Sequence, residues 1–286
     1  MFRLGSRVFE DSDYAVMAIV NRTPDSFFDK GATFAEDAAL RAVEKAVTDG
    51  ADIIDIGGVK AGPGTTVDPA EELRRTVPTV KAVRDRFPDV VISIDTWRAA
   101  VAREAIKAGA DLINDTWAGA DPELAMVAAE TGAALVCSHA GGLDPRTRPH
   151  RAAFADPVAD VLDTVNRLVE RALEVGVRRD GILIDPAHDF GKNTRHSLAI
   201  TKRLDEMVAT GWPVLVALSN KDFIGETLDA PVGDRLAGTL ATTAISAWLG
   251  ARVFRAHQVK ETRRVLDTVA AIRGDRQPAV ARRGLA

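Results

Sequence analysis

The 286-residue sequence contains a single cysteine, Cys137, which lies inside an apolar run. One cysteine cannot form a disulfide framework, and a reducing compartment is therefore expected. The apolar stretches are all shorter than the roughly 20 residues that a membrane-spanning helix needs, and residues 1–14 lack an apolar segment of secretory length. These absences predict a cytoplasmic protein with no membrane partner.

An excess of basic residues is also missing. Lys and Arg together number 37, against 41 Asp and Glu, which gives a net charge of −4. A nucleic-acid-binding domain needs basic residues gathered on one face. The arginines of the last fifteen residues are more typical of a solvated tail than of a binding patch. We therefore expect small-molecule ligands and no nucleic acid.

Two kinds of catalytic signature are absent or weak. None of the five histidines forms an H-x-H or H-E-x-x-H pair, so a metal hydrolase is poorly supported. Cys137 precedes Ser138 and His139, but its apolar surroundings favour a core residue over a nucleophile.

The sequence does contain a regular alternation of short apolar runs with longer helical segments. Such runs are typical of strands that are buried on both faces. They cover residues 15–20, 51–56, 90–94, 111–113, 133–137, 182–184, 214–218 and 252–254. Eight repeats predict an α/β fold, a single closed (β/α)8 TIM barrel. An open doubly wound sheet is the alternative, but it usually has fewer strands, and the G-x-G-x-x-G motif of dinucleotide-binding sheets is absent.

Capping residues predict where several helices begin and end. Thr33 and Glu36 form a capping-box pattern before a helical stripe of apolar residues, and Gly50 is placed to end that helix. Acids that precede a proline predict further helix starts at Asp68, Asp121 and Asp156. Because no linker divides the chain, we expect one domain over residues 1–286, with a core at about 15–273, a short N-terminal lead and a basic tail.

Polar or charged residues follow each of the eight predicted strands. They include Asn21, Asp55, Asp95, Thr96, Asn114, Asp115, Ser138, His139, Asp185, Ser219, Asn220, Lys221, Arg255 and His257. Any one of them could cap a helix or start a turn. Their occurrence at the same end of all eight strands predicts an active site at the mouth of the barrel.

Two ligand chemistries follow from these residues. Acceptors and an amide at Asp95, Asn114 and Asp185, with a donor at Lys221, suit a flat heterocycle that has N–H groups on one edge and a carbonyl on another.

A phosphate or pyrophosphate suits the other residues. Arg255 and His257 are two apart on a strand and therefore share a face, close to the glycine-rich first and second loops. Taken alone, His257 is equally well explained as a rim histidine bonded to a backbone carbonyl.

Seven motifs in order resemble dihydropteroate synthase, a folate-pathway enzyme with a (β/α)8 barrel. They are NRTPDSFFDKG, DIGG with GPG, ISIDT, INDTWAG, DPAHDFGKN, SNKDFIG and FRAHQV, between about Met17 and Val259. The pterin-binding domains of corrinoid methyltransferases share this barrel but usually lack the TPDSF loop.

The resemblance implies condensation of a dihydropterin methyl pyrophosphate with p-aminobenzoate in a homodimeric enzyme. It implies that Asp95, Asn114, Asp185 and Lys221 bind the pterin, and that Arg255 and His257 bind the pyrophosphate. It implies a Mg²⁺ ion bound by Asn21, and an acceptor site and lid formed by Lys60, Pro63, Ser219 and Asp222. The first and second loops would close over the substrates.

The second loop departs from the family pattern. The usual D-I-G-G-E-S-T-R-P-G is DIGGVKAGPG here, so the loop has lost its Thr and Arg but keeps Pro63. Lys60 supplies a positive charge, although as a flexible point charge and not as a planar fork.

The motif after the seventh strand also departs. The usual S-R-K-S is SNKD, which removes a cation at Asn220 and adds an acid at Asp222. If Asp222 faces the acceptor site, it repels the carboxylate of aminobenzoate. If it faces outward, it is an ordinary first-turn acid. The sequence leaves both orientations open.

Further changes lie in two other motifs. In DPAHDFGKN, His188 and Asp189 stand where Ile and Gly are usual, either as a polar pair near the pterin or as a rim hydrogen bond, and Trp117 replaces a common Ser-Gly step. Two functions remain: a working but weak dihydropteroate synthase, or a repurposed or non-catalytic pterin-binding paralogue. A pure scaffold protein would not need the retained polar residues.

Overall fold

The eight apolar runs form one parallel sheet in the computed structural model, which describes residues 1–24, 31–142, 144–147 and 153–284. The strands are β3 (Ala15–Asn21), β4 (Ile53–Gly57), β5 (Val91–Asp95), β6 (Leu112–Asp115), β7 (Ala134–Ser138), β8 (Ile182–Asp185), β9 (Leu215–Ala217) and β10 (Val253–Ala256). Strands β3 to β8 pair with their neighbours in chain order, β9 pairs with β10, and β10 pairs with β3. A parallel bridge between Ile184 and Val214 closes the ring, which confirms the predicted TIM barrel.

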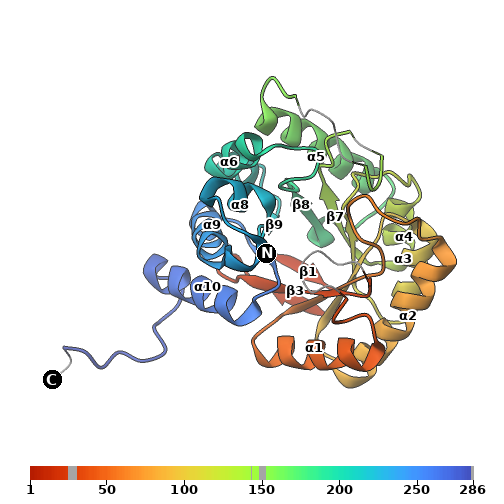
Figure 1. Ribbon diagram of the computed structural model, residues 1–286, viewed down its shortest axis with the longest axis horizontal. Coiled ribbons are helices and arrows are strands. Elements are labelled where there is room, and N and C mark those ends of the chain that lie inside the picture. The colour runs from red at the N-terminus through yellow and green to blue at the C-terminus, as the bar shows by residue number, and fades with distance from the viewer. Residues whose placement is uncertain (25–30, 143, 148–152, 285–286) are drawn as a thin grey trace.

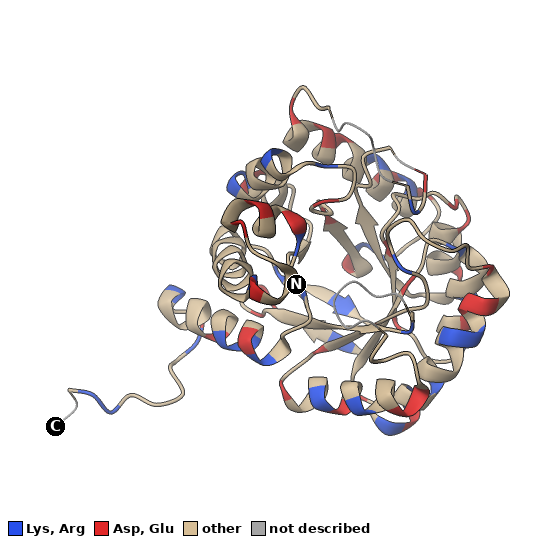
Figure 2. Ribbon diagram, viewed as in Figure 1, with Lys and Arg blue, Asp and Glu red and all other residues tan. Residues whose placement is uncertain are grey.

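Helices surround this ring (Figure 1). They are α1 (Glu36–Thr48), α2 (Pro69–Arg86), α3 (Ala99–Lys107), α4 (Leu124–Thr131), α5 (Pro157–Glu174), α6 (Thr194–Lys202), α7 (Leu204–Val208), α8 (Asp222–Leu228), α9 (Leu236–Leu249) and α10 (Val259–Arg273). Acidic and basic residues are interspersed along outer helices such as α1 and α2 (Figure 2). Among the residues that the structure describes, none forms a helix long and apolar enough to cross a membrane.

Two of the predicted acidic caps are present. Oδ1 of Asp68 accepts the N–H of Glu71 at 2.8 Å at the start of α2. Asp156 accepts the N–H of Val158 at 2.9 Å at the start of α5. Each cap satisfies an amide that the first helical turn leaves without an intrahelical partner.

Two other predicted helix starts are wrong. The helix after Asp121 begins only at Leu124. The carboxylate of Asp121 accepts the N–H of Glu123 at 3.0 Å just before that helix, and also the N–H of Ala99 at 2.8 Å at the start of α3. Thr33 does not cap α1, because its hydroxyl donates to the carbonyl of Asn21 at 2.6 Å. For Thr33, a partner distant in sequence thus competes successfully with the local one.

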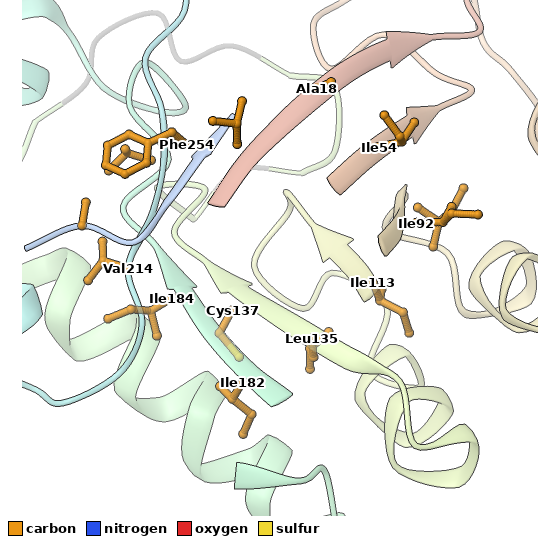
Figure 3. Close-up of a cluster of buried hydrophobic side chains, with 14 of the residues drawn as sticks. Ala18, Ile54, Ile92, Ile113, Leu135, Cys137, Ile182, Ile184, Val214 and Phe254 are labelled. Atoms are coloured by element: carbon orange, nitrogen blue, oxygen red, sulfur yellow. The ribbon is translucent and has the colours of Figure 1, made fainter. Parts of the chain in front are cut away.

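The apolar core has two layers, one on each face of the sheet. The outer layer lies between strands and helices and includes Ile54, Ile92 and Ile184 (Figure 3). The inner layer fills the barrel at the N-terminal ends of the strands and includes Met17 and Leu112. Burial on both faces is the physical reason why the strands read as continuous apolar runs.

An N-terminal hairpin that the sequence analysis missed completes the inner layer. It consists of β1 (Phe2–Leu4) and β2 (Arg7–Phe9), which pair antiparallel. The rings of Phe2 and Phe9 stack with centroids 4.8 Å apart, and Leu4 is buried beside them. These side chains join the cluster at the starts of the barrel strands. The hairpin therefore closes the N-terminal end of the barrel.

Replacing Phe9 with alanine tests this role. Phe9→Ala should lower the free energy of unfolding by about 3–5 kcal/mol, because it empties a buried aromatic position. Urea denaturation measures the change, and Val8→Ala is the matched control because the Val8 side chain is 46% exposed. Equal stabilities of the two variants would show that the hairpin contributes nothing to the core.

Candidate functional site

A hollow opens at the carboxyl ends of the strands. Its volume is about 840 Å³, including its opening to solvent. The predicted site residues that line it are Asn21, Lys60, Asp95, Asn114, Asp185, Ser219, Lys221, Arg255 and His257. The structure also places Phe190 and Thr116 there, which the sequence analysis did not select. The side chains come from strand ends far apart in the sequence, which the closed ring brings together.

The guanidinium of Arg255 binds two carboxylates inside the hollow. Its Nε lies 2.6 Å from Oδ2 of Asp55, and its Nη2 lies 2.8 Å from Oδ2 of Asp95. Asp55 is fully buried and also accepts the hydroxyl of Ser93 at 2.6 Å. The sequence places Asp55 at a strand end but predicts no role for it. Burial raises the pKa of Asp95, although the charge of Arg255 opposes this.

Asp185 and Lys221 lie on another part of the wall. One oxygen of Asp185 accepts the N–H of Ala187 at 2.7 Å. Burial raises the pKa of Asp185 to about 6, against the opposing effects of that N–H and of Lys221. The ammonium of Lys221 lies 4.5 Å from the centre of the Phe190 ring. Asp185 therefore remains an ionised acceptor above pH 6.

The wall is supported from behind by packed side chains. The ring of Phe190 contacts Trp117, with centroids 5.4 Å apart. Ser219 lies 3.0 Å from Nδ1 of His257, and Asn220 is buried beside it. Asn220, at the position where the family usually has a cation, is thus part of a neutral hydrogen-bonded network behind the wall.

Strand β7 is an exception to the pattern of polar strand ends. The hydroxyl of Ser138 donates to the carbonyl of Asp115, and Nε2 of His139 lies 2.6 Å from Asp160. The first contact joins β7 to β6 and the second joins the end of β7 to α5, and neither residue lines the hollow. Burial lowers the pKa of His139 to about 4, so this ring is neutral at physiological pH.

The second loop is fastened by an arginine from another loop. Arg146 donates to the carbonyls of Lys60 at 3.2 Å, Gly62 at 3.3 Å and Thr65 at 2.7 Å. Lys60 lines the hollow, whereas Pro63 is exposed outside it. No local sequence signal identifies Arg146, because it lies more than 80 positions from its partners.

Asp222 takes the outward of its two predicted orientations. Its side chain is 64% exposed and lies 2.9 Å from Nη1 of Arg235. Asp222 is therefore not among the residues that line the hollow.

The pair His188 and Asp189 also lies outside the hollow. His188 is buried, with Nε2 3.0 Å from the hydroxyl of Thr201 and its ring stacked on Phe223. Burial lowers the pKa of His188 to about 3, so the ring is neutral. Asp189 accepts the N–H of Phe223 at 3.2 Å, which matches the predicted rim hydrogen bond.

A metal would need ligands beyond those of the described residues. In the part of the chain that the structure describes, no group of three or more His, Cys, Asp or Glu side chains could hold a metal ion. Asn21 does line the hollow. The rest of its motif, residues 25–30, lies outside the described residues.

Comparison with known families agrees with this site. The family model described as "Pterin binding enzyme" matches residues 17–257. The chain belongs to this family of pterin-binding enzymes.

Three relatives show its position within the family. The chain is 58% identical over 275 residues to the inactive dihydropteroate synthase 2 of Mycobacterium leprae, covering 95% of this chain and 94% of the relative. It is 40% identical over 248 residues to the dihydropteroate synthase of Haemophilus influenzae, covering 86% and 90%. A crystal structure of the Yersinia pestis dihydropteroate synthase with a sulfonamide drug superposes with a TM-score of 0.91, at 35% identity, covering 96% of this chain and all of that one. The chain is thus similar both to proteins named dihydropteroate synthase and to a protein named inactive dihydropteroate synthase 2.

Arg146→Ala should release the second loop. We expect the endoproteinase Lys-C to cleave the native protein after Lys60 about tenfold faster in this variant, because three carbonyls lose a charged donor. Mass spectrometry of the timed digest identifies the cut. The control is Arg171→Ala, which removes an exposed arginine bonded to the carbonyl of Pro122. Unchanged cleavage after Lys60 would mean that Arg146 does not hold the loop.

Proposed function

We propose that the hollow binds a dihydropterin ring, and that this chain is a dihydropteroate synthase-type protein whose transfer to p-aminobenzoate is weak or lost. The observation that carries the proposal is the convergence of Asp95, Asn114, Asp185 and Lys221 in one hollow. Carboxylates accept the N–H groups along one edge of a pterin, and an ammonium donates to its carbonyl. Phe190 supplies an apolar surface beside them.

The leaving pyrophosphate would be held by Arg255 and His257. Mg²⁺ fits the donor set only in part: Asn21 offers one amide oxygen, and the pyrophosphate and water would have to supply the others, which is common for this ion. When bound, Mg²⁺ would neutralise charge on the leaving group. Of this chain's own residues, Arg255 and His257 would orient the pyrophosphate.

Weak or lost transfer follows from the charges that the hollow lacks. Arg255 already binds Asp55 and Asp95, so little of its charge is left for an incoming anion. The arginine of the usual second loop is absent, and Asn220 stands where the family has a cation. The name of the Mycobacterium leprae relative, inactive dihydropteroate synthase 2, agrees with this proposal. A pterin-binding paralogue that has lost its catalytic role is therefore the second candidate.

A product assay separates the two candidates. Purified protein is mixed with dihydropterin methyl pyrophosphate, p-aminobenzoate and Mg²⁺, beside the Haemophilus influenzae synthase and the Lys221→Ala variant. We expect dihydropteroate formation at least about a hundredfold slower than that of the synthase, since each lost cationic contact is worth about tenfold or more. Any residual activity should disappear in Lys221→Ala. A rate equal to that of the synthase would show that transfer is intact.

The pterin pocket is tested separately by Asp185→Asn. At pH 8 this variant should bind a reduced pterin about tenfold more weakly in calorimetry, because a charge-assisted acceptor becomes a neutral amide. In the unaltered protein, affinity should fall as the pH drops through 6, since burial raises the pKa of Asp185 to about 6 and the protonated acid is a poorer acceptor. Asp222→Asn, outside the hollow, is the control. Absence of pterin binding at millimolar concentration in the unaltered protein would refute the proposed function.

We also propose a homodimer, which forms in the cytoplasm through the outer face of α9. Ile245 and Trp248 lie one turn apart on this face, and Trp248 is 57% exposed. Ile272 of α10 is exposed as well, and Arg273 next to it donates to the carbonyl of Trp248 at 3.2 Å. An exposed apolar patch of this kind is typical of a subunit interface.

Trp248→Glu should convert such a dimer to monomers, because a charge placed in an apolar interface is costly. Light scattering after size-exclusion chromatography measures the mass. Met126→Glu, at an exposed position of α4, is the control. A monomeric unaltered protein, or a dimeric Trp248→Glu variant, would exclude this interface.

A further inference from the structure

Asp55 is a buried carboxylate that binds side chains from three other strands. It lies in β4, is 0% exposed, and is not among the residues that line the hollow. Its two oxygens accept hydrogen bonds from Ser93 of β5, Asn114 of β6 and Arg255 of β10. Asp55 is therefore closed to a ligand, and it can act only through the side chains that it holds.

The amide of Asn114 is bound by Asp55 and also lines the hollow. Its Nδ2 lies 3.4 Å from Oδ1 and 3.3 Å from Oδ2 of Asp55. The reverse orientation of the amide would place Oδ1 of Asn114 against two carboxylate oxygens with no hydrogen between them, which is repulsive. The charge of Asp55 thus fixes which end of the amide points into the barrel wall.

The oxygen of the same amide lacks a donor. Oδ1 of Asn114 is buried and has no hydrogen-bond partner among the residues that the structure describes. A buried acceptor without a partner costs free energy, which an N–H group of a ligand would recover. Because Nδ2 is bound to Asp55, the oxygen is the polar atom of this side chain that is left for a ligand.

We propose that Asp55 is a positioning residue that makes the hollow selective for N–H donors: its carboxylate holds Nδ2 of Asn114 in the barrel wall, so that Oδ1 is presented to the ligand as an acceptor. This inference rests on the proposed function, because it names the feature of the pterin ring that the site recognises. Heterocycles that carry an acceptor in place of that N–H group are rejected, since the amide cannot turn over.

Asparagine is the matched substitution for Asp55. Asp55→Asn keeps the shape and an oxygen for Arg255, but it faces Asn114 with both an oxygen and an NH2 group. The two orientations of Asn114 then become comparable in energy. Asp55→Ser is the second variant, whose hydroxyl either donates or accepts, and it keeps the test valid if the asparagine variant folds poorly.

A swap variant, which combines Asp55→Asn with Asn114→Asp, should restore the selectivity. The amide is now at position 55 and donates to a carboxylate at position 114, which presents acceptors only. The number of buried carboxylates is the same as in the unaltered protein. Rescue by the swap separates positioning of an acceptor from a general need for the shape or charge of Asp55.

The experiment compares three ligands by calorimetry without oxygen: 7,8-dihydropterin, oxidised pterin and 7,8-dihydrolumazine. Each of the last two exchanges an N–H donor of the first for an acceptor. We expect the unaltered protein and the swap variant to prefer 7,8-dihydropterin over both. In Asp55→Asn and Asp55→Ser, the preference over at least one analogue should narrow at least about fivefold, since the amide of Asn114 is free to turn.

Asp52→Asn is the matched control. Asp52 is a carboxylate just before β4 that also pairs with two arginines, Arg7 and Arg263, and it lies outside the hollow. This variant should leave all three affinities in their original ratio. Unchanged preferences in the folded Asp55 variants, or a swap variant that does not regain the preference, would overturn the inference.

The pairing of Asp55 with Asn114 is also tested without a ligand. Asn114→Asp alone places two buried carboxylates side by side, so its unfolding equilibrium constant in urea should be at least about tenfold larger than that of the swap variant. Equal constants would contradict the inference. If the unaltered protein binds none of the three ligands at millimolar concentration, the proposed function fails, and this comparison still decides whether Asp55 orients Asn114.

Discussion

The candidate site depends on one arrangement of buried charges, Arg255 between Asp55 and Asp95. The three residues belong to β10, β4 and β5, and β3 lies between β10 and β4 in the sheet. The side chain of Arg255 therefore reaches past a whole strand inside the barrel. Two buried carboxylates without a cation would be strongly unfavourable. Removing Arg255 alone would therefore cost more stability than replacing all three residues by apolar ones. The last strand thus allows the acids of the earlier strands to remain in the interior.

The same balance of buried charges determines which ligands the hollow can bind. Carboxylates and an amide are available around a ring-sized space, whereas Arg255 already has two carboxylates of the protein as partners. A heterocycle rich in N–H groups meets complementary acceptors, but an anion competes with Asp55 and Asp95 for Arg255. Loss of function in such a protein needs no damage to the fold, because the changes lie in loops and helix starts after the strands.

The strands and most of the site could be predicted from the sequence, for a physical reason. A strand buried on both faces must be apolar throughout, and in a closed barrel every strand ends at the same mouth, so Asp95 or Lys221 can be placed from its position alone. Features that depend on a distant partner could not be predicted. Arg146 reaches the second loop, Asp222 turns to Arg235, and Thr33 bonds to Asn21 instead of capping its helix.

The N-terminal hairpin has a consequence for the order in which the chain is made. Phe2, Leu4 and Phe9 leave the ribosome long before Val253 of the last strand, yet all four belong to the same buried cluster. The apolar side chains of the hairpin therefore cannot complete their native contacts until nearly the whole chain has been synthesised. Contacts of this sequence separation slow folding and leave apolar surface exposed in intermediates. The hairpin is accordingly a segment of the nascent chain that benefits from a chaperone.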